Sequence, residues 1–377
     1  MKKGKVKILF TIPNFNTAGS GKALINVISR LDKNIFEPSI CCRHDRGDLF
    51  KSAKELNVPI YITDFTVATK PRIRGASNIY KLSGIFRKIK PDIIHSYNYS
   101  DDYSEALAAK ISGIKWIYTK KNMSWGSNAW KMRTFLADAV IPQNEEMLEI
   151  FFKGLNKCRL IPIGINLKEF EHIERNEDIL ARYNLTTSAP VILTVANIIP
   201  IKGIDFLIRG FELASEDLPE AKLLIVGEDR NEYANELKKK VKEMNIGNKI
   251  VFTGKQSDIK DFFSIADMFI LSSMKAGEGG PISVLEAMAS GVLSYGSDVP
   301  GIRDQFRDFQ DQLFESENPG SIANKILKAF SMDADERKKR IEIQRQFIEK
   351  NYSIENELSE LPKLYLEVVK GKLQINS

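Results

Sequence analysis

Two glutamates separated by seven residues, Glu278 and Glu286 in the segment EGGPISVLEAMASG, are the residues best placed for chemistry in this sequence. An apolar run that ends at Leu271 precedes a glycine-rich loop, and Pro281 falls where a helix is expected to begin. The helix is mostly apolar and closes at Gly291, so we expect it to be largely buried and to carry Glu286 with it. A buried carboxylate is costly unless it is hydrogen bonded, and the hydroxyl groups of a sugar or ribose are suitable donors.

The loop between the two glutamates adds a candidate phosphate site. Glu278 is expected to point into the same space as Glu286, and backbone N–H groups after Pro281, together with the helix dipole, favour a diphosphate between the two acids. Either glutamate by itself is equally compatible with an exposed stripe beside a flexible loop.

A second small-residue loop, NFNTAGSGK, follows the first apolar run and leads into an amphipathic stretch. The nucleoside-triphosphate loop would need Gly at 16 and Ser or Thr at 23, but the chain has Asn16 and Ala23. The dinucleotide pattern fails too, because Leu24 stands where its third glycine belongs. The remaining prediction is a tight turn that holds an anion at a helix N-terminus, and the alternative is a helix start without a ligand. The residues of this turn are Gly19, Ser20, Gly21 and Lys22.

Short apolar runs that alternate with longer amphipathic stretches must position these loops. The pattern runs through the first half and restarts after residue 189 with VILTVA, KLLIVG, KIVFTG and DMFILS, which predicts two doubly wound parallel α/β domains. A length of 377 residues is enough for two cores. We expect an N-terminal domain at 1–168, a C-terminal domain at 169–350 and a final helix at 351–377 that crosses back to the first domain. Open sheets bind ligands beyond the carboxyl ends of their strands, so a cleft between facing domains is predicted.

Charge is divided unevenly along the chain. Residues 1–168 carry 28 Lys and Arg against 14 Asp and Glu, whereas the rest carries 27 against 35. The basic half favours an anionic partner, and we expect a peripheral contact with an anionic membrane; an ordinary lysine-bearing surface is the alternative. Nucleic acid is not expected as a partner, because no recognition motif accompanies the charge. The residues predicted to form the basic, aromatic patch are Lys70, Arg72, Arg74, Arg87, Lys88, Lys90, Lys115, Trp116, Lys120, Lys121, Trp125, Trp130, Lys131 and Arg133.

Several classes of protein are excluded by what the sequence lacks. No apolar run approaches the length of a membrane span, and the N-terminal run ends without a signal-peptide cleavage site, so a cytoplasmic protein is expected. Three cysteines, two of them adjacent, build neither a disulfide framework nor a zinc site. Because no cluster has metal-ligand spacing, we expect no metal and no cofactor.

The segment EGGPISVLEAMASG resembles the EGxPxxxLEAMAxG signature of retaining glycosyltransferases of family four, which have the GT-B fold. The order of other segments is similar over nearly the whole chain, among them PDIIH, LIPIGINLKEF, ANIIPIKGIDFLI, LLIVGED and SDVPGIRD. The resemblance implies two Rossmann-like domains, a nucleotide sugar bound mostly by the second, an acceptor held by the first, and transfer with retention.

The resemblance also implies roles for individual residues. Glu278 resembles the residue that contacts the donor sugar, Glu286 the one that holds the ribose, and Lys202 in PIKG the lysine that neutralises the donor diphosphate. Glu278 and Lys202 are thus the candidate catalytic residues. The other candidate donor-binding residues are Glu286, Gly279, Gly280, Pro281, Ile282, Ser283, Asn197, Gly19 and Gly21; on the acceptor side they are Lys22, His95, Lys121 and Asn122.

Two departures from the family pattern bear on turnover. Asn197 stands where the family often has an arginine, so half of a diphosphate clamp is missing unless Arg303 or Lys275 compensates. No histidine follows the run KWIYT, where many relatives contact the donor sugar. His95 lies at the carboxyl end of a predicted strand, but a structural histidine with satisfied hydrogen bonds is the favoured interpretation.

These observations predict a metal-independent retaining glycosyltransferase. It would move a sugar from a nucleotide sugar, with UDP as the first guess, to a cell-envelope glycan or lipid-linked acceptor, at the inner face of the membrane. The alternatives are a nucleotide-sugar epimerase or hydrolase of the same architecture and a noncatalytic sugar-binding protein.

Overall fold

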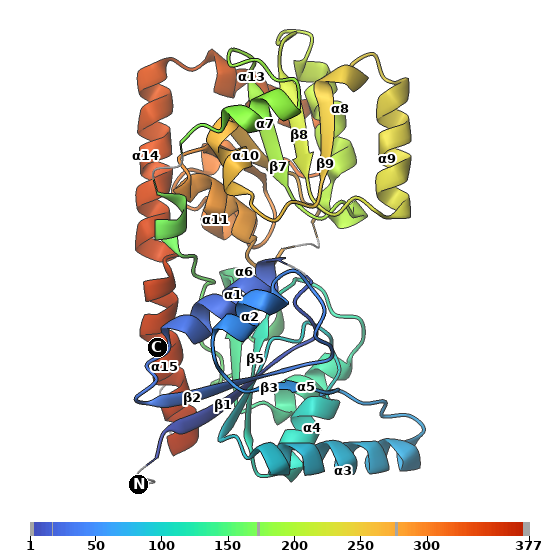
Figure 1. Ribbon diagram of the computed structural model, residues 1–377, viewed down its shortest axis with the longest axis vertical. Coiled ribbons are helices and arrows are strands. Elements are labelled where there is room, and N and C mark those ends of the chain that lie inside the picture. Colours follow the sequence, from blue (N-terminus) through green and yellow to red (C-terminus); the bar gives the residue numbers. More distant parts are fainter. Residues whose placement is uncertain (1–3, 17, 172–173, 276–277, 372–377) are drawn as a thin grey trace. The chain divides into compact units, whose positions relative to one another are not determined.

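The computed structural model describes residues 4–16, 18–171, 174–275 and 278–371 (Figure 1). The chain forms two compact units: unit 1 comprises Met1–Gly164 and Ile354–Ser377, and unit 2 comprises Ile165–Ser353. The last segment of the chain therefore belongs to the unit that the first segment builds.

Unit 1 contains a six-stranded parallel sheet in the order β3-β2-β1-β4-β5-β6. Its strands are β1 Val6–Ile12, β2 Phe36–Cys42, β3 Ile60–Ile62, β4 Ile93–Ser96, β5 Lys115–Lys120 and β6 Ala139–Pro142. Its helices are α1 Ala18–Arg30, α2 Phe50–Glu55, α3 Arg72–Ile89, α4 Ser104–Ile111, α5 Ala129–Leu136, α6 Glu145–Phe151 and α15 Ile354–Lys370. Strands β4 and β6 are buried along their whole length, as expected for a parallel sheet with helices on both faces.

Unit 2 repeats this plan with a six-stranded parallel sheet in the order β12-β11-β10-β7-β8-β9. Its strands are β7 Val191–Val195, β8 Lys222–Val226, β9 Ile250–Gly254, β10 Met268–Leu271, β11 Leu293–Ser297 and β12 Leu313–Phe314. Its α-helices are α7 Glu177–Arg182, α8 Ile204–Ala214, α9 Glu232–Glu243, α10 Lys260–Ile265, α11 Ile282–Ala289, α12 Ile302–Gln305, α13 Pro319–Ser331 and α14 Ala334–Asn351. Its short 3₁₀ turns are η1 Leu167–Phe170, η2 Pro200–Lys202, η3 Gly247–Lys249 and η4 Gln310–Gln312.

Both sheets have the strand order 3-2-1-4-5-6 when the strands are numbered within each unit. This is the doubly wound Rossmann order, and the prediction of that fold is confirmed. The order reverses beside the first strand, between β1 and β4 in unit 1 and between β7 and β10 in unit 2. Loops diverge at these switch points, so the backbone leaves room for a ligand at the carboxyl edge of each sheet.

Each unit has its own apolar core. In unit 2, helices α8 and α13 pack together on the sheet through fully buried side chains such as Leu207, Phe211 and Ile322. Burying one such side chain stabilises the fold by about 1.5–3 kcal/mol. In unit 1 the corresponding core includes the stacked rings of Trp116 and Tyr118 on β5.

Helix α15 is fixed to unit 1 by polar as well as apolar contacts. The Tyr365 hydroxyl lies 2.7 Å from Nδ1 of His95 on β4, and Arg159 donates two hydrogen bonds to Glu367, at 2.8 and 3.1 Å. The Glu357 carboxylate accepts from the backbone N–H of Gly164 at 2.8 Å. The predicted packing of the final helix on the first domain is confirmed.

The tight turn predicted at Gly19 to Lys22 is wrong, because helix α1 already begins at Ala18. These residues form its first turns, and their N–H groups point along the helix rather than around a separate loop. Gly21 packs closely on Leu49: a Cβ there would lie 2.8 Å from Cδ1 of Leu49, which would have to shift.

Three residues of the predicted basic, aromatic patch are also misplaced, because Trp116, Lys120 and Arg133 are buried. The Arg133 guanidinium donates to the carbonyl oxygens of Asp102 and Asn98, at 2.7 and 3.0 Å, and lies over the rings of β5. Backbone carbonyls solvate these charges, so they do not reach the surface.

Candidate functional site

The switch point of unit 2 brings together two loops that are distant in the sequence. One loop follows β7 and runs through η2 to Gly203, and the other follows β10. The Met274 N–H donates to the Ile201 carbonyl at 2.9 Å, and the Ser272 hydroxyl donates to the Lys202 carbonyl at 3.0 Å. Gly203 has φ +60°, and a Cβ there would overlap the Ser272 carbonyl oxygen, so glycine is required for this close approach.

Lys202 and Glu278 form an ion pair across these loops. The same oxygen of Glu278, Oε1, accepts from the Ser273 hydroxyl at 2.5 Å. The Glu278 side chain is 8% exposed and that of Lys202 is 21% exposed, so the pair is partly desolvated but open to a ligand. Among the described residues, Oε2 of Glu278 has no hydrogen bond and is available to accept from one.

Serines at the ends of neighbouring strands support this pair. The Ser273 carbonyl accepts from the hydroxyls of Ser297, at 2.6 Å, and Ser316, at 3.2 Å. These serines are not predicted from the sequence, although each lies at or just beyond the end of a strand. Because parallel strands end at one edge, these side chains converge behind Glu278.

Helix α11 begins beside Glu278, and its N-cap residue is Pro281, whose side chain makes no capping hydrogen bond. The helix is largely buried, Glu286 is 5% exposed, and Gly291 follows with φ +75°, as the sequence predicts. Gly279 is buried, and a Cβ on Gly301 would lie 2.8 Å from its carbonyl oxygen. Gly280, Ile282 and Ser283 are half-buried.

The cations proposed to replace an arginine at position 197 lie elsewhere on the same edge. Asn197 is exposed, and its carbonyl accepts from the Ile199 N–H at 2.9 Å. Nε of Arg303 is bound to Oδ1 of Asp298 at 2.5 Å. Arg303 and the exposed Lys275 line one pocket, which also contains Asp298.

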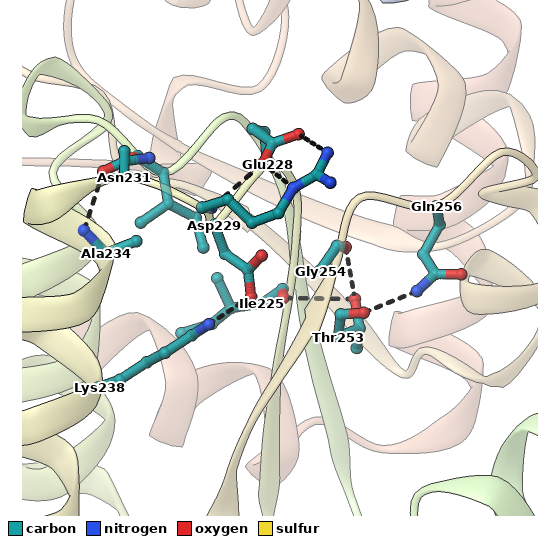
Figure 2. Close-up of polar contacts among 11 residues, drawn as sticks. Ile225, Glu228, Asp229, Asn231, Ala234, Lys238, Thr253, Gly254 and Gln256 are labelled. Carbon is teal, nitrogen blue, oxygen red and sulfur yellow. Dashed lines mark hydrogen bonds and ion pairs between the residues drawn. The ribbon is translucent and has the colours of Figure 1, made fainter. Parts of the chain in front are cut away.

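The loops after β8 and β9 form a second polar region of the same edge (Figure 2). The Arg230 guanidinium donates to both carboxylate oxygens of Glu228, at 2.9 and 3.0 Å, and lowers the pKa of that carboxyl to about 2. Lys238 binds Asp229 at 2.5 Å, and the Gln256 amide donates to the Thr253 carbonyl at 2.7 Å. These contacts fix the backbone beyond both strands.

In unit 1, His95 is fully buried at the end of β4. Its ring nitrogens lie 2.7 Å from the Tyr365 hydroxyl and 2.8 Å from the Thr119 hydroxyl. Burial, reinforced by the charge of Lys121, lowers its pKa to about 3, so the ring is neutral at physiological pH. The histidine holds β4, β5 and α15 together.

Lys121 follows β5, and its ammonium lies 3.9 Å from the centre of the Tyr97 ring. Its nitrogen is buried and has no hydrogen-bond partner among the described residues. Burial lowers the pKa of Lys121 to about 7, against the opposing charge of Glu357, and burial raises the pKa of Glu357 to about 7. Asn122 accepts from Lys120 through its side-chain oxygen at 2.7 Å.

The candidates therefore form a group within each unit. The unit 2 group contains Lys202, Glu278 and the start of α11, and the unit 1 group contains His95 and Lys121; Gly19, Gly21 and Lys22 lie on α1. Over the described ranges, no three His, Cys, Asp or Glu side chains are close enough to share a metal ion. In the same part of the chain, the helices are too short or too polar to traverse a bilayer.

Solved structures of the same fold match nearly the whole chain. A glycosyltransferase from Rickettsia africae is 22% identical and superposes with a TM-score of 0.84, covering 98% of this chain and 100% of that one. HepE of Anabaena, in complex with UDP and glucose, is 16% identical with a TM-score of 0.79, covering 95% and 98%. Two doubly wound domains of this order define the GT-B class.

The sequence matches two family models that follow one another along the chain. Residues 17–169 match "Glycosyltransferase Family 4" and residues 175–347 match "Glycosyl transferases group 1". Together the two matches extend over most of the chain, which is therefore similar to GT-B glycosyltransferases of the family 4 type.

Characterised and uncharacterised relatives share only part of the sequence. An uncharacterized glycosyltransferase of Methanocaldococcus jannaschii is 28% identical over 237 residues, and the match spans about half of each chain, 56% of both. The N,N'-diacetylbacillosaminyl-diphospho-undecaprenol alpha-1,3-N-acetylgalactosaminyltransferase of Campylobacter jejuni is 26% identical over 299 residues, covering 72% of this chain and 77% of that one.

Proposed function

We propose that this protein transfers a sugar, with retention and without a metal, from a nucleotide sugar to a cell-envelope glycan or lipid-linked acceptor. A UDP-sugar is the first donor to test. The observation that carries the proposal is the Lys202–Glu278 pair at the switch point of unit 2, beside the start of α11. It brings together a cation, a carboxylate that can accept from a sugar hydroxyl, and the N-terminus of a helix.

The chemistry follows from where charge develops. When the bond between C1 of the sugar and the diphosphate oxygen breaks, the electron pair leaves with the nucleoside diphosphate, and Lys202 with the α11 N–H groups stabilises that charge. Glu278 accepts from sugar hydroxyls, and Glu286 accepts from the ribose. The acceptor hydroxyl then bonds to C1 on the face that the leaving group occupied, and its proton passes to the departing phosphate.

In the resting site Lys202 and Glu278 neutralise each other. A bound diphosphate would pair with Lys202 in place of Glu278. Donor binding would thus free the Glu278 carboxylate to accept hydrogen bonds from the sugar. This exchange makes the ion pair compatible with catalysis.

Relatives support the choice of donor and acceptor class. HepE of Anabaena has been solved with UDP and with UDP-glucose. The Campylobacter jejuni relative is named for a diphospho-undecaprenol acceptor, and one from Streptococcus pneumoniae is an alpha-monoglucosyldiacylglycerol synthase. These names favour a UDP donor and a lipid-linked acceptor for this chain.

Helix α3 supports a peripheral contact with an anionic membrane. Residues 65–91 contain seven Lys and Arg and no Asp or Glu. Two apolar side chains on this helix are exposed among the charges, Ile73 at 91% and Tyr80 at 65%. Basic residues interleaved with exposed apolar ones are the composition that binds the interface of anionic lipids.

Sugar binding without transfer is the second candidate, and the neutral Asn197 favours it, because half of a diphosphate clamp carries no charge. The experiment that separates the two is a titration of the protein with UDP, GDP, ADP and their sugars, with EDTA and with Mg²⁺, while free nucleoside diphosphate is measured. Selective binding with slow release of diphosphate in EDTA is the expected result. Binding without release would favour the second candidate, and no binding of any nucleotide would overturn both.

A further inference from the structure

A pocket of about 400 Å³ lies within unit 2, apart from the Lys202–Glu278 pair. It is at the carboxyl edge of the sheet, where Asp298 follows β11 and Glu315 and Ser316 follow β12. Its volume falls in the range of small-molecule sites. The residues that line it are Lys275, Asp298, Arg303, Gln310, Leu313, Phe314, Glu315 and Ser316.

The charges of this pocket balance, which argues against a phosphate or nucleotide as its occupant. Two cations and two carboxylates line it, and Arg303 is already bound to Asp298 through Nε, at 2.5 Å, and through Nη2 to its carbonyl, at 3.3 Å. Little positive charge is left for an anion, because the other cation of the lining, Lys275, is balanced by a second acid, Glu315.

The polar groups that remain suit a ligand with many hydroxyls. Lys275 has no ion pair or hydrogen bond within the described part of the chain, and Glu315 uses only Oε2, which accepts from Asn318 at 2.7 Å. The Lys275 ammonium and the Gln310 amide can donate hydrogen bonds, and the Glu315 carboxylate can accept them. This set matches neighbouring sugar hydroxyls, because every hydroxyl both donates and accepts. We infer that this pocket is a second carbohydrate site, which binds one residue of a neutral saccharide.

The pocket is linked to Glu278 through two hydrogen bonds. The Ser316 hydroxyl, in the pocket lining, donates to the Ser273 carbonyl at 3.2 Å, and the Ser273 hydroxyl donates to Glu278 at 2.5 Å. A saccharide here would thus lie one residue away from the carboxylate proposed to hold the donor sugar. Binding in the pocket does not require transfer, so it can be tested independently of the proposed function.

The test is saturation-transfer NMR on the full chain, with glucose, galactose, N-acetylglucosamine and maltose as neutral probes and glucuronate and glucose 1-phosphate as charged ones. We expect neutral probes to bind more tightly than charged ones. Lys275→Met and Glu315→Gln should each weaken neutral binding at least fivefold. The matched controls are Glu220→Gln, at the opposite edge of the sheet before β8, and Lys239→Met on α9, both exposed, and neither should change it.

Saturating UDP, measured on the same samples, separates this inference from the proposed function. Neutral sugars that still bind in the presence of UDP would support a site distinct from the donor site. The inference is overturned if neutral sugars do not bind, if UDP displaces them, or if charged probes bind more tightly. It is also overturned if the two pocket variants, shown by thermal melting to be folded, bind sugars like the controls. UDP binding without saccharide binding would overturn the pocket and leave the transferase proposal standing.

Discussion

Lys202 is the residue on which the proposed chemistry depends most. Its ammonium is held by Glu278 on a loop fixed to β10, so it is positioned before a donor arrives. Lys202→Met should reduce the release of nucleoside diphosphate by about 100-fold, since removing one group that stabilises developing charge typically costs 10²–10³ in rate. The measurement is kcat for donor hydrolysis or transfer.

Lys202→Arg is the matched control, because it keeps the charge and should retain most of the activity. Lys202→Met also leaves Glu278 without its cation, so UDP affinity and thermal melting are needed to separate a fold defect from lost catalysis. Turnover that survives Lys202→Met in a folded protein would place the diphosphate elsewhere.

Glu286 is predicted to act in binding rather than in bond cleavage. Hydrogen bonds to a charged group contribute about 1.5–3 kcal/mol, so Glu286→Ala should weaken UDP binding by about 10- to 100-fold. Calorimetry with UDP, and with uracil as the ligand without ribose, checks this prediction: the affinity for UDP should fall. A variant that binds UDP like the wild type would refute the assignment of Glu286 to the ribose.

Glu357 gives the stability of unit 1 a pH dependence. Burial raises its folded-state pKa from 4.5 to about 7, so the folded protein holds a proton that the unfolded chain has lost. Because the unfolded state binds fewer protons between pH 4.5 and 7, stability falls as pH rises through that window. The groups that face Glu357 electrostatically include Lys121, Tyr97 and Tyr365.

Glu357→Gln should remove that loss, because a neutral amide can still accept from Gly164. We expect the variant to match the wild type near pH 4.5 and to be more stable at pH 7.5, by on the order of 2–3 kcal/mol. Urea denaturation at the two pH values measures the difference. An equal difference at both values would show that Glu357 is ionised in the folded protein.

Among elements, the loop before α12 controls the start of α11. Gly301 has φ +79°, and a Cβ there would lie 2.8 Å from the Gly279 carbonyl oxygen and 2.9 Å from that of Glu278. Gly301→Ala should therefore destabilise unit 2 by about 1–3 kcal/mol and displace Glu278, which raises the KM for the donor. Gly84→Ala, in helix α3 with no atom within 4 Å of the added Cβ, is the control and should be neutral or slightly stabilising.

Helix α3 should bind anionic membranes through its exposed charges. Each Lys or Arg near an anionic surface contributes about 1 kcal/mol, so replacing three by Gln should reduce binding to phosphatidylglycerol vesicles at least tenfold. Co-sedimentation with vesicles measures this, and phosphatidylcholine vesicles should bind neither protein. The changed residues are Arg72, Arg74 and Lys81, and the control set on α9 is Lys239, Lys240 and Lys242. Equal loss in both sets would mean that net charge, not α3, attracts the lipid.

At the scale of the molecule, the sequence predicts what depends on local pattern and misses what depends on distant partners. The apolar runs mark the strands because a parallel sheet covered on both faces must be apolar, and Gly291 ends α11 as its type demands. The Lys202–Glu278 ion pair joins residues 76 apart and depends on β10 lying beside β7, which no local pattern encodes. Arg133 appears in the sequence as a surface charge, but in the fold it is buried and donates to the carbonyl oxygen of Asp102, 31 residues away.

The two cores predict two unfolding transitions that can be assigned. The core around β7, β8 and β10 consists of unit 2 residues only, whereas α15 belongs to unit 1 although it ends the chain. Leu207→Ala on α8 and Leu364→Ala on α15 each truncate a fully buried side chain. Each should reduce the free energy of unfolding of its own unit by about 2–5 kcal/mol and so lower one transition. The proposed donor site lies in unit 2. UDP at 100 times its Kd should therefore stabilise unit 2 by about 2.7 kcal/mol, which raises the transition that is sensitive to Leu207→Ala, and it should leave the other transition unchanged. Calorimetry with and without UDP measures both, and stabilisation of only the transition sensitive to Leu364→Ala would place the nucleotide on unit 1 and refute the assignment of Lys202, Glu278 and Glu286.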